Sequence, residues 1–147
     1  MARSFHFKLE KILDYRRQAE DQAKLALSQA RAAVRDQVRL LDRVEKELSA
    51  CVAEMSAPRQ MSQADLWLWS GWRSSLELDK NLAQAKLTQL ELQAEARHKD
   101  LVTKSMQRKL LEKLKAKQAE KHEHEEQRAE QNACDEAATL RHGRTSF

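Results

Sequence analysis

The sequence contains very little glycine, proline and cysteine. Its 147 residues include two glycines, one proline and two cysteines. Two glycines cannot build the phosphate-binding loops of nucleotide-dependent enzymes, and none of the motifs GxxxxGK[ST], GxGxxG, HExxH or GxSxG occurs. Cys51 and Cys134 lie far apart and match no CxxC spacing, which argues against a structural disulfide or a zinc site. We therefore expect no enzymatic activity and no cofactor.

A weak metal site is the one chemical alternative that the residue types leave. His122 and His124 stand among glutamates, and imidazole and carboxylate groups can both bind metals. Residues two apart lie on different sides of a helix, however, so the two imidazoles cannot share one ion there. A solvated helix face is the better interpretation, and we expect no metal.

Long apolar runs are also missing. No stretch approaches the roughly 18 apolar residues that span a bilayer. The first residues do not resemble a secretory signal. Charged residues make up 34% of the chain with a net charge of +4, and acids and bases alternate through most of it. This mixture is typical of solvated helix faces rather than of a nucleic-acid footprint, and we expect a cytoplasmic protein.

What the sequence has instead is a heptad repeat over residues 9–55. Wide apolar side chains recur every seventh residue, interrupted by Glu20, and a second row follows three residues after the first, with Arg16 and Gln37 as polar exceptions. No glycine or proline interrupts the repeat. The sequence predicts one helix over about 4–55, capped by Ser4, with a partner helix along one face. The seam positions are Leu9, Leu13, Ala23, Leu27, Ala30, Val34, Leu41, Val44, Leu48, Cys51 and Met55.

A short break separates this helix from a second one. Pro58 disfavours helix in the preceding residue, and Ser62 with Asp65 resembles a capping box. We expect a turn over about 56–61 and a second helix over about 62–140, with a disordered tail at 141–147. A short link between long helices gives an antiparallel hairpin, here one all-α coiled-coil domain over 1–147.

The second helix keeps the seam spacing as far as Leu101, where the phase of the repeat slips. From residue 115 to 135 no large apolar residue occurs. Bases dominate over 97–117 and acids over 118–136. We expect the chain beyond about Leu114 to project past the first helix as a charged helical end, which suggests docking to a charged partner.

Three tryptophans open the second helix. Trp67 and Trp69 lie about 200° apart around a helix, so at least one tryptophan of the group with Trp72 should be exposed. Bulky residues often close the tip of a hairpin, and an exposed aromatic at a tip is also a candidate partner contact. The sequence leaves both interpretations open.

Motifs at both ends of the chain resemble the flagellar export protein FliJ. The first is F-x-F-x-L-E-K-I-L-D-Y-R-R-x-x-E over 5–20, and the second is R-K-L-L-E-K-L-K over 108–115. A third, E-Q-N-A-C-D-E-A-A, covers 130–138 and is followed by Arg141. The resemblance covers the whole length of the chain.

The resemblance implies a cytoplasmic component of the flagellar type III export apparatus. Proteins of this family are antiparallel two-helix coiled coils similar to the gamma subunit of rotary ATPases. They bind the central pore of a hexameric export ATPase, contact the export-gate membrane protein and handle export chaperones. Such a protein would be peripheral to the inner membrane only through its partners. It would bind no nucleic acid.

The resemblance also assigns two groups of residues. Export-gate contact would involve Trp69, Trp72 and Leu76, although the density of tryptophan departs from the family pattern. The ATPase-facing residues would be Phe5, Phe7, Lys8, Arg16, Arg17, Arg128, Glu130, Gln131, Asp135, Glu136 and Arg141. The alternatives are the equivalent stalk of a virulence secretion system and a generic coiled-coil scaffold.

Overall fold

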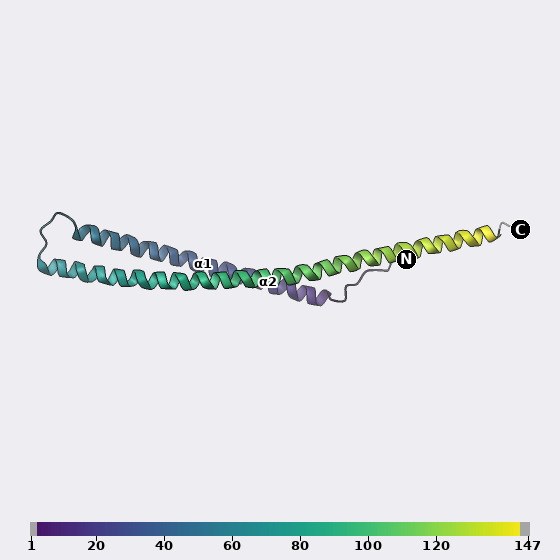
Figure 1. The fold of residues 1–147 in the computed structure, drawn as a ribbon, viewed down its shortest axis with the longest axis horizontal. Coiled ribbons are helices and arrows are strands. Elements are labelled where there is room, and N and C mark those ends of the chain that lie inside the picture. Colours follow the sequence, from purple (N-terminus) through teal and green to yellow (C-terminus); the bar gives the residue numbers. More distant parts are fainter. Residues whose placement is uncertain (1–2, 145–147) are drawn as a thin grey trace. The chain divides into compact units, whose positions relative to one another are not determined.

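The computed structural model describes residues 3–144 and is helical wherever it has regular structure. Helix α1 covers Glu10–Met55, helix α2 covers Gln63–Arg144, and residues 56–62 connect them (Figure 1). The two helices pack against each other as a hairpin, so the predicted all-α fold is confirmed. Within the described residues, neither helix has an apolar stretch that could cross a membrane.

Contacts divide the described chain into two units. The loop unit comprises residues 21–102, and the terminal unit comprises residues 3–20 with 103–144. Both helices contribute to both units, because the division falls within α1 after Glu20 and within α2 before Thr103.

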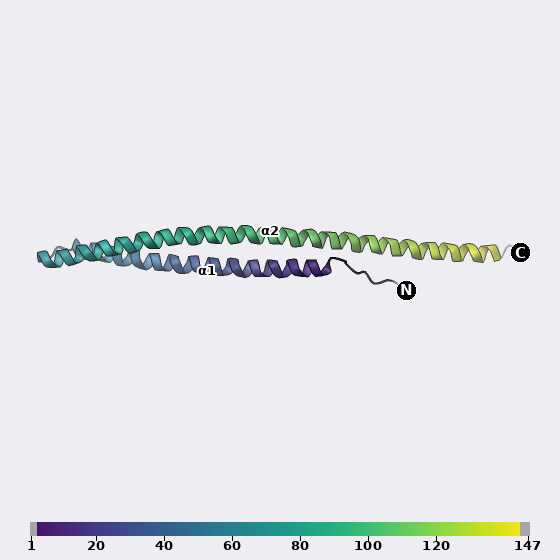
Figure 2. The same cartoon turned by 90° about the horizontal axis from the view of Figure 1, so that it is seen from below.

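In the loop unit, α1 and the first half of α2 run antiparallel (Figure 2). Two polar contacts set the pairing: Gln37 Nε2 donates to the carbonyl oxygen of Ala83 at 3.1 Å, and Cys51 Sγ lies 3.8 Å from the carbonyl oxygen of Trp69. The core of this unit lies in the heptad rows, since apolar side chains facing the partner helix are the ones removed from water. Its buried apolar residues are Ala23, Leu27, Cys51, Leu76 and Ala83.

The connection between the helices has the local chemistry that the sequence predicts. Pro58 lies in the non-helical stretch, and Arg59 forms an ion pair with Glu54 across it. Ser62 Oγ accepts a hydrogen bond from the backbone N–H of Asp65 at 3.1 Å. This is the geometry of a helix N-cap, and it satisfies one of the backbone donors that the first turn of α2 leaves unpaired.

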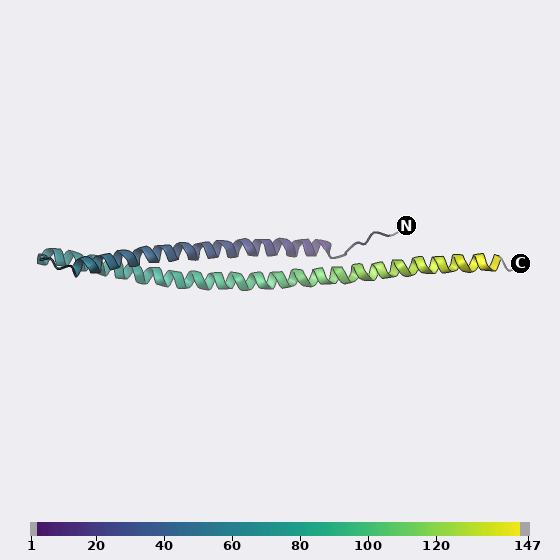
Figure 3. The same cartoon turned by 90° about the horizontal axis from the view of Figure 1, so that it is seen from above.

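In the terminal unit, α1 begins at Glu10 rather than near Ser4. Ser4 does not cap a helix, because α1 begins six residues after it. Its hydroxyl lies 3.2 Å from His6 Nε2 instead. The first helical N–H, that of Glu10, donates to the Phe7 carbonyl oxygen at 3.2 Å. Residues 3–9 instead form a non-helical segment beside α2 (Figure 3), with the side chain of Phe7 buried. Burial of this aromatic side chain stabilises the segment without helical hydrogen bonds.

Helix α2 continues through Arg144, so residues 141–144 are helical where the sequence predicts a disordered tail. Residues 145–147 of that tail lie outside the described residues. All side chains over 127–144 are exposed. This stretch is the helical end that the polar composition predicts. Lys115 pairs with Glu10, the first residue of α1, and the non-helical residues 3–9 contact α2 farther along, as far as Glu126.

Candidate interaction surfaces

The three polar interruptions of the heptad repeat each contact α2. Gln37 is buried and pairs with a backbone carbonyl in the loop unit. In the terminal unit, Arg16 Nη1 donates to Gln107 Oε1 at 2.7 Å, and Glu20, only 4% exposed, pairs with Arg108. Polar groups at seam positions favour one alignment of the helices, since any other alignment would leave them buried and unpaired.

Arg108 is the centre of the larger ionic network. Its Nε donates to Glu20, and its Nη1 donates to Glu112 Oε2 at 2.7 Å. The hydrogen bond that Arg108 donates to the Glu20 carboxylate raises the pKa of Arg108 above its ordinary value, and the nearby charge of Glu112 acts in the same direction. Because an arginine side chain is already fully protonated in proteins, this upward shift keeps the guanidinium charged at every physiological pH.

Arg17 and Glu10 extend the network along the same helices. Arg17 lies 3.3 Å from Asp14 and 3.6 Å from Glu112, and Lys115 Nζ lies 2.8 Å from Glu10 Oε2. The start of α1 is thus held to α2 by charged groups at several points. Such partly exposed pairs contribute little stability individually and weaken in salt.

The non-helical segment over 3–9 contacts α2 through an aromatic ring and a backbone hydrogen bond. The Phe5 ring lies against His122, with ring centroids 5.7 Å apart and planes inclined by 55°. The backbone N–H of Arg3 donates to Glu126 Oε1 at 2.6 Å. Of the three residues assigned to the ATPase contact here, Lys8 is exposed, Phe5 is half-buried and Phe7 is buried. Only the lysine and part of the Phe5 ring are accessible.

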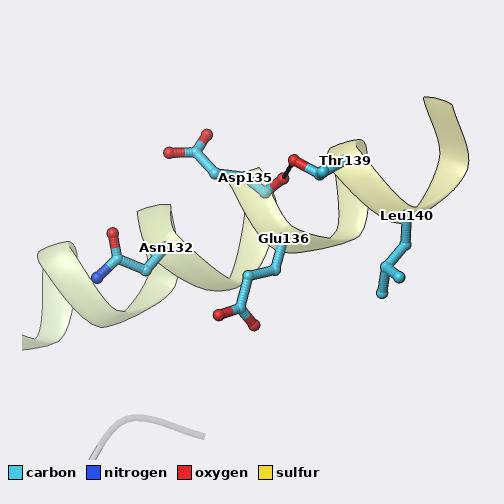
Figure 4. A pocket seen from close by; sticks show the side chains of 5 residues that line it. All are labelled: Asn132, Asp135, Glu136, Thr139 and Leu140. Carbon is cyan, nitrogen blue, oxygen red and sulfur yellow. Dashed lines mark hydrogen bonds between the residues drawn. The ribbon is translucent and has the colours of Figure 1, made fainter. Parts of the chain in front are cut away.

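The C-terminal residues that the resemblance assigns to the ATPase contact all lie on the unpacked end of α2, residues 127–144, where every side chain is exposed. Figure 4 shows Asp135, Glu136 and their neighbours along this end, where Thr139 Oγ1 donates to the Asp135 carbonyl oxygen at 2.8 Å. The other assigned side chains of this group are exposed as well: Arg128, Glu130, Gln131 and Arg141. Both assigned groups therefore belong to the terminal unit, one packed on α2 and the other without a partner helix.

The start of α2 in the loop unit carries an exposed aromatic surface. Trp67 is 75% exposed, Trp72 is also exposed, and Leu68, Trp69 and Trp72 line a shallow hollow. The prediction that at least one tryptophan is exposed is thus confirmed. Leu76, in contrast, is only 2% exposed, so its side chain belongs to the hairpin core rather than to the accessible surface.

Sequence reasoning did not identify Gln107, Arg108, Glu112 and Lys115 as partners of α1. The signal was present, because Glu20 interrupts the apolar row and the run of bases over 97–117 lies where an antiparallel partner would meet it. Trp67 was likewise not assigned to the gate contact. Its exposure depends on the rotation of α2, which the short apolar cluster does not determine.

Comparisons with known proteins agree with the motifs at the two ends of the chain. No curated protein and no solved structure matches the chain. A family model described as "Flagellar FliJ protein" matches residues 5–146. That match includes the three motifs over 5–20, 108–115 and 130–138, both helices and the connection between them. The chain therefore belongs to the flagellar FliJ family and is a component of flagellar protein export.

Proposed function

We propose that this protein is a non-enzymatic stalk and chaperone escort of the flagellar type III export apparatus. In this proposal, the terminal unit binds in the central pore of the hexameric export ATPase. The start of α2 contacts the export-gate membrane protein, and the chain also binds export chaperones. It works in the cytoplasm and reaches the inner membrane through these partners.

The observation that carries the ATPase assignment is the unpacked end of α2. Residues 127–144 keep helical geometry with every side chain exposed, and they carry acids and bases together. A helix without packing partners is only marginally stable in water, so a partner that surrounds this end would stabilise it. Mixed exposed charges form salt-dependent contacts that exchange easily, which suits a stalk facing several equivalent subunits.

The gate assignment is supported by the exposed tryptophans. Large aromatic side chains that remain accessible are typical anchors of protein interfaces. Trp72 and the accessible part of Trp69 form the contact in this proposal, joined by Trp67. Leu76 supports them from the core and does not itself touch the partner.

The ATPase contact is tested by binding and by ATP hydrolysis of the cognate export ATPase. Arg128→Glu combined with Asp135→Lys leaves the net charge unchanged while reversing two exposed charges. We expect this variant to lose stimulation of hydrolysis while its circular dichroism stays helical. Arg43→Glu combined with Asp79→Lys is the matched control, because both residues are exposed in the loop unit. Equal stimulation by both variants would exclude the assignment of this end.

The gate contact is tested separately with Trp72→Ala and the control Leu92→Ala, which removes another exposed apolar side chain of α2. We expect only the first variant to weaken binding to the soluble domain of the gate protein. The equivalent stalk of a virulence secretion system is the alternative function. Deletion distinguishes them: a deletion strain that swims and exports flagellar proteins normally would remove the flagellar assignment.

A further inference from the structure

The terminal unit carries apolar side chains on the outside of α2 and charged ones against α1. Met106, Leu110 and Leu114 are all exposed, Leu110 by 67%. Meanwhile the residues of α2 that contact α1 in the same turns are Gln107, Arg108 and Glu112. Burying apolar side chains stabilises a hairpin, so stability alone would favour these leucines against α1 and the charged residues on the outside.

Helix geometry places Met106 and Leu110 nearly opposite Arg108, and Leu114 about 120° from it. Met106 and Leu110 each lie two residues from Arg108, which corresponds to about 160° around the helix. Their spacing of four residues aligns them with Leu114 in one ridge of the type that packs into the groove of another helix. We call these three residues the outer ridge.

Two lysines lie on the same face of α2, one between Leu110 and Leu114 and one three residues after Leu114. Lys113 and Lys117 lie about 140° and 180° around the helix from Arg108. Both are exposed, and within the described residues neither has an ion-pair partner. The surface therefore combines a row of apolar side chains with two positive charges beside its C-terminal part.

We propose that the outer ridge and these lysines dock an acidic amphipathic helix of a partner protein. Leucine-like side chains of that helix would pack on Met106, Leu110 and Leu114, and its carboxylates would pair with Lys113 and Lys117. This surface shares no residue with the ATPase and gate contacts proposed above, although it lies in the same terminal unit as the ATPase contact.

Charge and apolar content favour this occupant over the others. A second copy of the chain offers either the same lysines, which would repel, or its acidic stretch over 118–136, which has no large apolar residue. A bilayer surface requires a broad apolar face, whereas the outer ridge is a single row of three side chains. A nucleic acid would make no use of the leucines.

The experiment replaces Leu110 with a photoreactive phenylalanine analogue in the full chain and irradiates cells that express it. Leu92 replaced in the same way is the control, because it is an equally exposed leucine of α2 in the loop unit. We expect an adduct specific to position 110, and mass spectrometry should map it to an acidic segment with apolar residues every three or four positions. An adduct with lipid, nucleic acid or a second copy, or none above the control, would overturn the proposal.

A binding measurement with a peptide of the captured sequence then tests the surface itself. We expect Leu110→Ser, and separately Lys113→Glu with Lys117→Glu, to weaken peptide binding at least tenfold. The effect of the charge reversal should shrink as salt is added. Leu92→Ser and Lys86→Glu are the matched controls and should leave binding unchanged. Equal weakening by the controls would show that the contact is nonspecific and would overturn the proposal.

Discussion

Replacing Leu76 by alanine separates the structural from the binding role of the residues at the start of α2. Leu76 is 2% exposed, and full burial of a leucine side chain stabilises a protein by about 1.5–3 kcal/mol. Leu→Ala substitutions cost about 2–5 kcal/mol once the cavity is included. In a hairpin only two helices line the site, which allows partial collapse, and we therefore expect a loss of about 2–3 kcal/mol.

The assay is urea unfolding followed by far-ultraviolet circular dichroism, with Trp72→Ala as the comparison. Trp72 is half exposed, so its truncation should cost less than about 1 kcal/mol. A loss of about 2 kcal/mol is a large part of the 5–15 kcal/mol that stabilises a typical domain, and the transition midpoint of Leu76→Ala should fall clearly. An unchanged midpoint for Leu76→Ala, with destabilisation by Trp72→Ala instead, would refute the burial argument for this surface.

Three further substitutions test other features of the hairpin. Gly71→Ala should stabilise the protein by about 0.5–1 kcal/mol, because Gly71 lies within α2 and an added Cβ meets no atom within 4 Å; a lower melting temperature would contradict this. Ser62→Ala should cost about 1 kcal/mol by removing the N-cap of α2, while Ser62→Asp should retain most of the stability in the same thermal melts. Gln37→Ala should cost about 1–2 kcal/mol, since it removes a buried hydrogen bond to Ala83 and leaves a gap; no change in urea unfolding would show that the bond contributes nothing.

The sequence predicted the features that depend on local chemistry and periodicity. The heptad rows identified Leu13, Leu27 and Cys51, all of which are buried. Pro58 and Ser62 marked the break and the cap because their backbone preferences act within a few residues. These signals do not require knowledge of the partner helix.

Features that depend on the rotation of one helix against the other could not be read from the sequence. Beyond Leu101 the phase of the repeat slips, and the sequence does not show which residues continue the seam: Met106 and Leu110 are exposed, and Arg108 occupies the contact with α1. The ionic partner Glu20 decides this rotation, because a buried carboxylate without a cation would cost more than exposing leucines. The late start of α1 depends similarly on Phe7, whose burial requires the non-helical path of residues 3–9.

The clustering of the tryptophans has a practical consequence. All three occur within residues 67–72, so the tryptophan fluorescence of the protein comes from one place in the loop unit, with Trp67 and Trp72 facing solvent. Tyr15, the single tyrosine, lies in the terminal unit. A blue shift of the tryptophan emission on adding a candidate partner would therefore show, without any label, that the partner covers the exposed aromatic surface at the start of α2.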